Sequence, residues 1–152
     1  MGRLTVCVAV GVGELAMADG TTRGTFATLA GQKYINLTTF RRDGSPVATP
    51  VWFAREGEVL YITTYDGTGK VKRLRANERV EIAPSDARGN VRGPVQAARG
   101  RVVVDAGEAA RAEAALRRTY GWQYRVIRLM TNLASRRRTG GAARIYLALT
   151  PA

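Results

Sequence analysis

Residues 33–65, KYINLTTFRRDGSPVATPVWFAREGEVLYITTY, decide the fold class. β-branched and aromatic residues dominate this stretch, and short polar turns interrupt them at Asp43-Gly44-Ser45 and Glu56-Gly57. Residues of this kind favour strands, and turns this short make consecutive strands antiparallel neighbours. The pattern therefore predicts three antiparallel strands, over 34–41, 47–54 and 59–65.

Beyond residue 65 the sequence adds further strands and then helices. Alanine-rich helix formers occupy the stretch before Gly121, which is placed to end a helix. Gly100 is placed to bend a strand, and we expect the run Arg136–Arg138 to be a solvated loop. The predicted elements are helices over 71–76, 107–120 and around 126–133, and strands over 80–83, 95–104 and 144–149. Six or so antiparallel strands with late helices predict a mainly β protein, built as a small closed or half-closed barrel.

Residues 1–24 stand apart from this barrel, whose single domain we place at 25–152. The apolar run 4–12 followed by Ala16-Met17-Ala18 resembles a weak secretory signal. Only one cation precedes the run, and Gly11 within it and Gly13 directly after it dilute its apolar character, so we favour an N-terminal extension or extra strand of a cytoplasmic protein. The run is also too short to span a bilayer.

The composition excludes several kinds of active site. The 152 residues include no histidine and a single cysteine, Cys7. Catalytic triads with histidine, zinc sites with imidazole ligands and an internal disulfide are therefore impossible. Carboxylates, lysine, tyrosine and arginine remain for acid and base chemistry. If the protein is an enzyme, we expect a bound cofactor to carry the reaction.

The net charge points to an anionic partner. Lysine and arginine number 24 against 12 acidic residues, which gives a formal charge of +12. Arginine greatly outnumbers lysine, as GC-rich codon usage also produces. Nucleic acid, acidic lipid and a phosphorylated small molecule all fit this charge.

The densest cationic segment is 66–75, DGTGKVKRLR. A glycine-containing loop that leads into a helix presents backbone N–H groups, and a lysine beside them completes a phosphate site. Thr64 and Val71 stand where a nucleotide-binding Walker loop has glycine and Ser/Thr, so that motif is absent. The alternative is a solvated basic helix face.

Two aromatic segments are further candidates. In Thr49-Pro50-Val51-Trp52-Phe53 the proline predicts a strand edge or a bulge, where the backbone can face a ligand. Trp52 and Phe53 should point to opposite faces, one into the core and the other toward a planar ring. The three aromatic residues within 120–124 predict a subunit contact or a pocket lid, and interleaved arginines would also suit nucleic-acid stacking.

Several segments in this order resemble the split β-barrel flavin and deazaflavin oxidoreductases, a group similar to pyridoxamine 5′-phosphate oxidase, and most of all its branch that binds coenzyme F420. The resemblance spans 31–152. It rests on the segments Lys33-Tyr34, Thr38–Arg41, Asp43–Pro46, Thr49–Phe53, Thr68–Lys72, Asn77–Val80 and Tyr120–Trp122.

The resemblance implies a split, FMN-binding-like barrel and a homodimer with each cofactor in a groove between the two barrels. The segment from Thr68 would hold the cofactor phosphate, the strand from Thr49 would line the ring, and two threonines would face the ring from the adjacent strand. The implied cofactor-binding residues are Thr49, Pro50, Val51, Trp52, Thr63, Thr64, Thr68, Gly69, Lys70 and Lys72, with Arg73 and Arg75 in the same helix.

The resemblance also implies the function: an F420-dependent reductase that transfers a hydride between the deazaflavin and a small organic acceptor such as an enone or quinone. The anionic coenzyme suits a basic groove. An FMN-dependent oxidase or reductase of the same fold is the first alternative, and a non-enzymatic module that binds cofactor, haem or nucleic acid is the second. We expect neither a nucleic-acid partner nor a membrane span. Without histidine, the proton would come from water, Tyr65 or Arg41.

Overall fold

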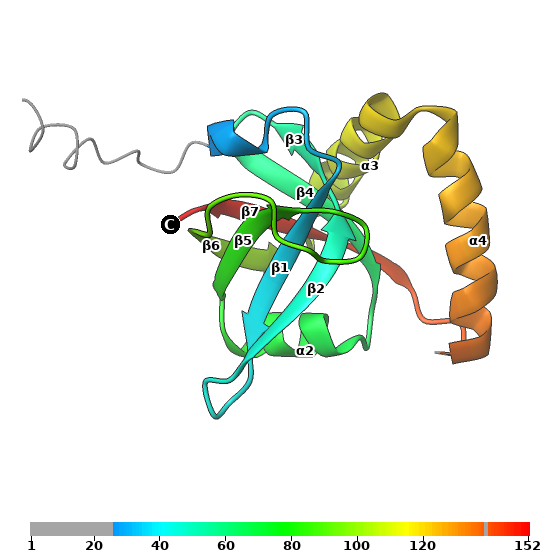
Figure 1. Cartoon of the computed structure of the whole chain (residues 1–152). Helices are drawn as coiled ribbons and strands as arrows, with labels where there is room; N and C mark the ends of the chain where they lie inside the picture. Colours follow the sequence, from blue (N-terminus) through cyan, green and yellow to red (C-terminus); the bar gives the residue numbers. More distant parts are fainter. Residues whose placement is uncertain (1–25, 139) are drawn as a thin grey trace, which may run out of the picture.

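A computed structural model describes residues 26–138 and 140–152. Seven antiparallel strands form one strongly curled sheet, a half-barrel that Figure 1 shows around its core. The sheet order is β2-β1-β5-β6-β7-β4-β3. The strands are β1 (Tyr34–Phe40), β2 (Pro46–Trp52), β3 (Ala54–Glu56), β4 (Val59–Tyr65), β5 (Arg79–Ser85), β6 (Gln96–Val102) and β7 (Arg144–Pro151). The prediction of a mainly β split barrel is confirmed.

The predicted strand over 47–54 is wrong as a single element. β2 pairs with β1, with Pro50 opposite Asn36, whereas β3 pairs with β4. Between them Phe53 pairs with neither strand, so the chain turns there from one edge of the sheet to the other. Pro50 lies on an edge strand, as expected for a residue that cannot donate to a ladder.

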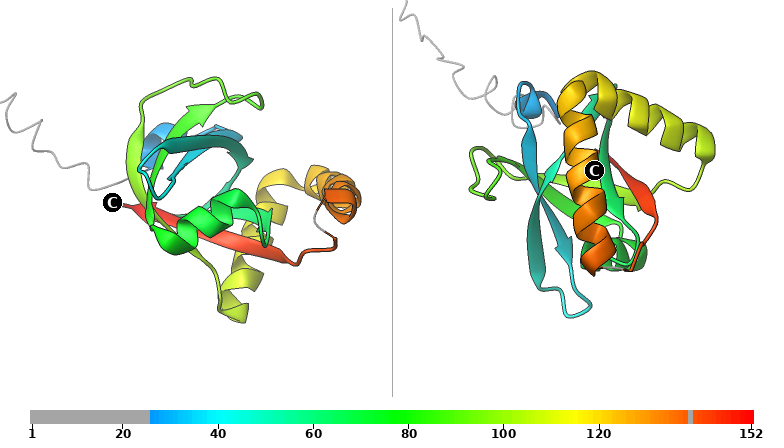
Figure 2. Two further views of the ribbon diagram at one scale, coloured as in Figure 1. Left: turned by 90° about the horizontal axis from the view of Figure 1, so that it is seen from below. Right: turned by 90° about the vertical axis from the view of Figure 1, so that its right-hand side faces the viewer.

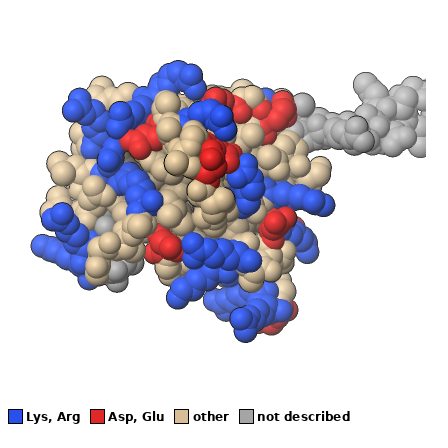
Figure 3. Space-filling model, turned by 180° about the vertical axis from the view of Figure 1, so that it is seen from behind, with Lys and Arg blue, Asp and Glu red and all other residues tan. Residues whose placement is uncertain are grey.

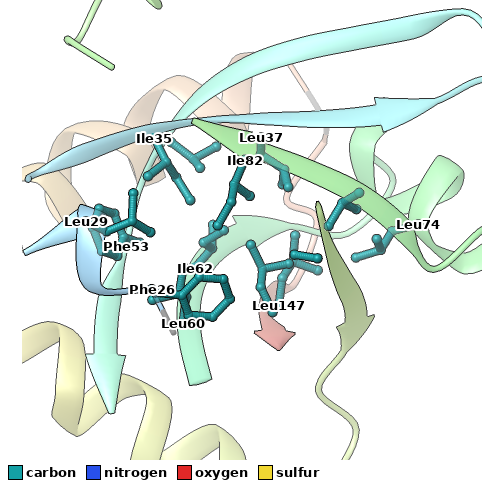
Figure 4. Close-up of a cluster of buried hydrophobic side chains, with 14 of the residues drawn as sticks. Phe26, Leu29, Ile35, Leu37, Phe53, Leu60, Ile62, Leu74, Ile82 and Leu147 are labelled. Carbon is teal, nitrogen blue, oxygen red and sulfur yellow. The ribbon is translucent and has the colours of Figure 1, made fainter. Parts of the chain in front are cut away.

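The core fills the inside of the curled sheet (Figure 4). Phe26 of the short 3-10 helix η1 (Phe26–Leu29) closes one end, and Leu74 of α2 (Gly69–Ala76) closes the other. Gly100 is buried in β6, and a Cβ added there would come within 2.8 Å of both Leu149 and Leu74. The absence of a side chain at this position therefore lets α2 pack against the sheet.

Two consecutive helices follow β6. The first, α3 (Ala106–Tyr120), begins where the Asp105 side chain accepts a hydrogen bond from the Glu108 N–H, and it ends at Gly121, whose φ is 54°. The second, α4 (Trp122–Arg138), lies beside the barrel (Figure 2). The prediction of a loop over 136–138 is wrong, because α4 continues through these arginines.

No helix among residues 26–138 and 140–152 is long and apolar enough to cross a membrane. The expectations for residues 1–24 concern a segment outside the described residues.

Candidate functional site

A pocket of about 270 Å³ lies between the barrel and the inner side of α4. We call it the barrel–helix pocket. β2, β4, the start of α2, both long helices and the start of β7 contribute to it. Its lining residues are Pro50, Val51, Trp52, Thr63, Thr64, Tyr65, Lys70, Leu116, Tyr124, Ile127, Arg128 and Arg144.

Trp52 forms the aromatic wall at the end of β2. It is half-buried, with its ring 5.2 Å from that of Tyr34, edge to face, and 4.7 Å from that of Tyr120. The next residue, Phe53, is buried in the core. The alternation of the strand thus places one aromatic ring in the core and the other at the pocket, as the sequence predicted.

The Tyr120 hydroxyl fixes this aromatic wall to the barrel. It accepts a hydrogen bond from the Phe53 N–H at 3.2 Å, and its proton can go to the carbonyl of Phe53 at 2.5 Å or of Lys33 at 3.0 Å. These bonds provide partners for the backbone N–H and carbonyl of Phe53, the residue between β2 and β3 that pairs with no strand. Burial raises the pKa of Tyr120 to about 12, so the hydroxyl remains a donor at neutral pH.

Two polar atoms of pocket-lining residues are buried without a hydrogen-bond partner among the described residues. They are Thr63 Oγ1, on β4, and the Tyr124 hydroxyl, on α4. Buried polar atoms are usually paired, because an unsatisfied one costs about 1–3 kcal/mol.

Three cations, and no carboxylate of the described chain, line the pocket: Lys70, Arg128 and Arg144. Burial, with a smaller contribution from nearby Arg73, lowers the pKa of Lys70. Lys70 makes no ion pair with any residue in the described part of the chain. A partly buried ammonium that lacks a counter-ion favours an anionic ligand.

Hydrogen bonds between charged and polar groups hold α4 against the barrel. Glu113 of α3 accepts bonds of 2.7 Å from Arg128, from Arg117 and from the Tyr146 hydroxyl. Burial alone would raise the pKa of Glu113, but the Tyr146 hydrogen bond and the two guanidinium groups outweigh burial and lower it. The carboxylate is thus charged at neutral pH and positions Arg128 at the pocket.

Asn132 extends the same contact between α4 and the barrel. Its Oδ1 accepts hydrogen bonds from the Tyr65 hydroxyl and from Arg144, each at 2.7 Å. Tyr65 and Arg144 both line the pocket, so this wall is defined at the ends of β4 and β7. Of the two side chains considered as proton donors, Tyr65 lies at the pocket and Arg41 does not.

Six of the ten predicted site residues line the pocket: Pro50, Val51, Trp52, Thr63, Thr64 and Lys70. β2 and β4 are not neighbours in the strand order, so the curl of the sheet, not strand pairing, brings their residues together, and α2 adds the lysine. The other four, Thr49, Thr68, Gly69 and Lys72, are not among its lining residues. Thr68 precedes α2 and donates its hydroxyl to the carbonyl of Tyr65 at 3.1 Å. All ten assignments as cofactor-binding residues stay predictions.

Lys72 lies on the opposite side of α2 from the pocket. It borders a second hollow with Phe40, Arg41, Arg42 and Arg73. Residues two apart in a helix point in nearly opposite directions, which explains why Lys70 and Lys72 face different hollows. The fold therefore does not bring Lys70 and Lys72 together at a single phosphate site.

Four residues that line the pocket were not predicted from the sequence: Leu116, Ile127, Arg128 and Arg144. Tyr124 belongs to a predicted aromatic segment, but its position on the inner side of α4 was not predicted. The spacing of Tyr124, Ile127 and Arg128 puts them on one helix face, a signal that was present in the sequence. Trp122, from the same aromatic segment, is 72% exposed and does not contribute to the pocket.

The surface charge does not mark a nucleic-acid groove on the face drawn in Figure 3. Lysine and arginine side chains are spread over this face with acidic side chains among them. A nucleic-acid site would gather cations in one stripe or patch.

Comparison with known proteins identifies the family. The family described as pyridoxamine 5′-phosphate oxidase matches residues 24–151. No curated protein matches the chain significantly.

Solved structures share the fold at low sequence identity. The heme storage protein from Vibrio cholerae is 15% identical, with a TM-score of 0.59, over 81% of this chain and 84% of that chain. An FAD-binding protein from Mesorhizobium loti is 17% identical, with a TM-score of 0.53, over 91% and 87%. A pyridoxinephosphate oxidase family protein from Clostridium acetobutylicum is 13% identical, with a TM-score of 0.53, over 81% and 78%.

Proposed function

This chain belongs to the pyridoxamine 5′-phosphate oxidase family, and from that premise we propose that it is an oxidoreductase that binds the deazaflavin coenzyme F420. The proposed reaction transfers a hydride between the coenzyme and a small organic acceptor. The observation that carries the proposal is the barrel–helix pocket, which combines aromatic walls with three cations and no lining carboxylate among the described residues.

The pocket residues fit a planar ring that bears polar substituents. Trp52 and Tyr124 supply flat apolar surface, and Leu116 and Ile127 add aliphatic surface. Thr63 Oγ1 and the Tyr124 hydroxyl are buried behind this surface without partners among the described residues, and a rotation of the Thr63 side chain would let its hydroxyl bond a ring carbonyl or N–H group. The name of the Mesorhizobium loti relative, an FAD-binding protein, supports a flavin-type ring.

The cations fit the anionic part of such a cofactor. Lys70 has no ion-pair partner in the described chain, and Arg144 donates only to uncharged oxygens in its described hydrogen bonds. Charge-assisted hydrogen bonds from these groups to a phosphodiester would be stronger than neutral ones. A coenzyme that carries several negative charges would gain most from this arrangement, and on that ground we prefer F420 to FMN.

The bound cofactor would supply the hydride chemistry. The protein's own residues would bind and orient it: Trp52 and Tyr124 would exclude water from the ring, and Lys70 would hold the anionic group. Tyr65 lies at the pocket with its hydroxyl already bonded to Asn132. We therefore assign proton delivery to water.

A second copy of the chain would complete the site. A volume of about 270 Å³ is small for a whole cofactor of this class, since ligand pockets commonly reach 300–1,000 Å³. Trp52 ends an edge strand and Pro50 is exposed, so this side of the pocket is open. We propose a homodimer in which the partner barrel covers this open side.

Fluorescence and absorbance titrations against coenzyme F420 and FMN test the proposal. We expect F420 to bind more tightly, and Lys70→Ala to raise its Kd roughly 10- to 150-fold, the scale of a lost charge-assisted hydrogen bond. Lys33→Ala, which removes an exposed lysine outside the pocket lining, is the matched control and should leave the Kd unchanged.

Other outcomes of these titrations would change the proposed cofactor, the role of Lys70 or the proposed function. A protein that purifies yellow and prefers FMN would establish the flavin alternative. An unchanged Kd for Lys70→Ala would remove the phosphate role of Lys70. If neither cofactor binds and the protein binds DNA with a steep salt dependence, the oxidoreductase proposal fails.

A further inference from the structure

The outer face of α4 is an apolar stripe that no other described element covers. Figure 2 shows this helix at the side of the molecule, away from the barrel core. Of the eight large apolar side chains that are exposed among the described residues, five lie on α4. They are Trp122 (72% exposed), Val126 (45%), Leu129 (63%), Met130 (67%) and Leu133 (58%).

These five residues fall on one side of the helix. Their spacing places them within a sector of roughly 100°, the width of an apolar face that is normally buried. The opposite side, with Tyr124, Ile127 and Arg128, already faces the barrel–helix pocket. The exposed stripe is therefore not the face that packs α4 against its own domain, and it calls for an external partner.

The charges beside the stripe indicate which partner fits. The sequence of α4, WQYRVIRLMTNLASRRR, contains five arginines and no acidic residue. Arg125, Arg136 and Arg137 are exposed and lie at the borders or the C-terminal end of the stripe. Two copies of this helix packed face to face would bring arginines together without a carboxylate on either helix, so self-pairing through α4 is disfavoured.

We propose that α4 docks the protein on an anionic phospholipid surface. Helices that lie in a membrane interface combine an apolar face containing Trp or Leu with arginine or lysine around it. Trp122, Leu129 and Leu133 would enter the boundary between headgroups and acyl chains. Arg125, Arg136 and Arg137 would bind lipid phosphates at the borders of the stripe. The helix would lie on the surface and would not cross it.

Flotation of the full chain with lipid vesicles tests this proposal. We expect binding to vesicles of phosphatidylcholine with phosphatidylglycerol, and weak binding to vesicles of phosphatidylcholine alone. At about 1 M salt, where the Debye length falls to roughly 3 Å, binding to the anionic vesicles should fall markedly. Strong and equal binding to both kinds of vesicle, or none to either, would overturn the proposal.

A pair of double variants locates the contact. Leu129→Glu with Leu133→Glu should weaken vesicle binding at least about tenfold, because it places charges on the apolar stripe. Val95→Glu with Val104→Glu makes the same change in charge at residues that are 60% and 92% exposed and lie off α4, and it should weaken binding far less. Both proteins keep residues 1–25, so any contribution of that segment is the same in both. Equal loss in the two variants would overturn the assignment to α4.

Tryptophan fluorescence gives a second measurement. Anionic vesicles should shift the emission of the wild-type protein to shorter wavelength as Trp122 leaves water, and Trp122→Phe should lose this shift. Light scattering in the absence of lipid tests the competing explanation, in which a second copy of the chain covers the apolar stripe. If the Leu129/Leu133 double variant converts a dimer to a monomer and the wild-type protein does not bind vesicles, the stripe is an interface between copies and the lipid proposal is wrong.

Discussion

Replacing Tyr120 with phenylalanine tests whether one side-chain hydroxyl holds the junction between β2 and β3. In the folded protein this hydroxyl accepts from the Phe53 N–H and can donate to the Phe53 carbonyl. Tyr120 is 6% exposed and Phe53 is 4% exposed, so water does not readily replace the lost partner. The phenylalanine ring would retain the contact with Trp52, which isolates the contribution of the hydroxyl.

The expected cost follows from the two backbone groups. Each buried group left unsatisfied costs about 1–3 kcal/mol, so we expect the free energy of unfolding to fall by about 2–6 kcal/mol. For a chain of this length 1 kcal/mol corresponds to about 2–4 °C, so the Tm should fall by about 4–24 °C. Urea denaturation followed by circular dichroism measures the first quantity, and a thermal scan measures the second.

The same substitution at Tyr124 is the matched control. Tyr124 is 3% exposed, but its buried hydroxyl has no hydrogen-bond partner in the described chain. Removing an unpaired hydroxyl should change the stability by less than about 0.5 kcal/mol or increase it slightly. If Tyr120→Phe destabilises the protein no more than Tyr124→Phe does, the hydroxyl does not hold the strand junction and our account of the Trp52 wall is wrong.

Two further predictions concern pH. Burial lowers the pKa of Lys70 in the free protein, and a bound anion would raise it again. Binding of the cofactor is then coupled to the uptake of a proton by Lys70. The affinity for the cofactor should therefore fall as the pH rises from 7 toward about 10.5. Lys70→Arg stays charged over this range and should bind with a flat pH profile in the same titration; a sloping profile in both proteins would remove Lys70 as the cause. Arg101 donates hydrogen bonds of 2.6 and 2.8 Å to Glu108, and they lower the pKa of Glu108 against the effect of burial. The Arg101–Glu108 pair therefore contributes its full stabilisation when the pH is above the ordinary glutamate pKa. This stabilisation is lost as the pH falls through the lowered pKa of Glu108. Glu108→Gln should therefore unfold about 1–3 kcal/mol more easily at pH 7, and its deficit should shrink in urea titrations at acidic pH; a constant deficit would contradict this linkage.

Local sequence signals were sufficient for most of the secondary structure. The alternation of residues 59–65 predicted β4 with its observed bounds, and Gly121 marked the end of α3 because a positive φ suits glycine there. The same signals failed at Phe53. Residues 47–54 do not by themselves show that the run forms two strands, and the residue that bonds the Phe53 backbone at the break, Tyr120, lies 67 positions away.

The sequence by itself determined the fold class, the exclusion of histidine and disulfide chemistry, and the candidate residues on β2, β4 and α2. The fold class, the exclusions and the candidate segments on β2 and α2 follow from residue types and short spacings, which act within a few residues. The β4 candidates, Thr63 and Thr64, follow only from the resemblance to the family. Only the tertiary structure decided which candidates share a pocket. Arg128 and Arg144 reach the pocket from the end of the chain, and Lys72 leaves it because a helix turns two neighbouring lysines to opposite sides. The exposure of the α4 stripe was likewise decided by packing, because periodicity shows that a helix has an apolar face but not whether the protein covers it.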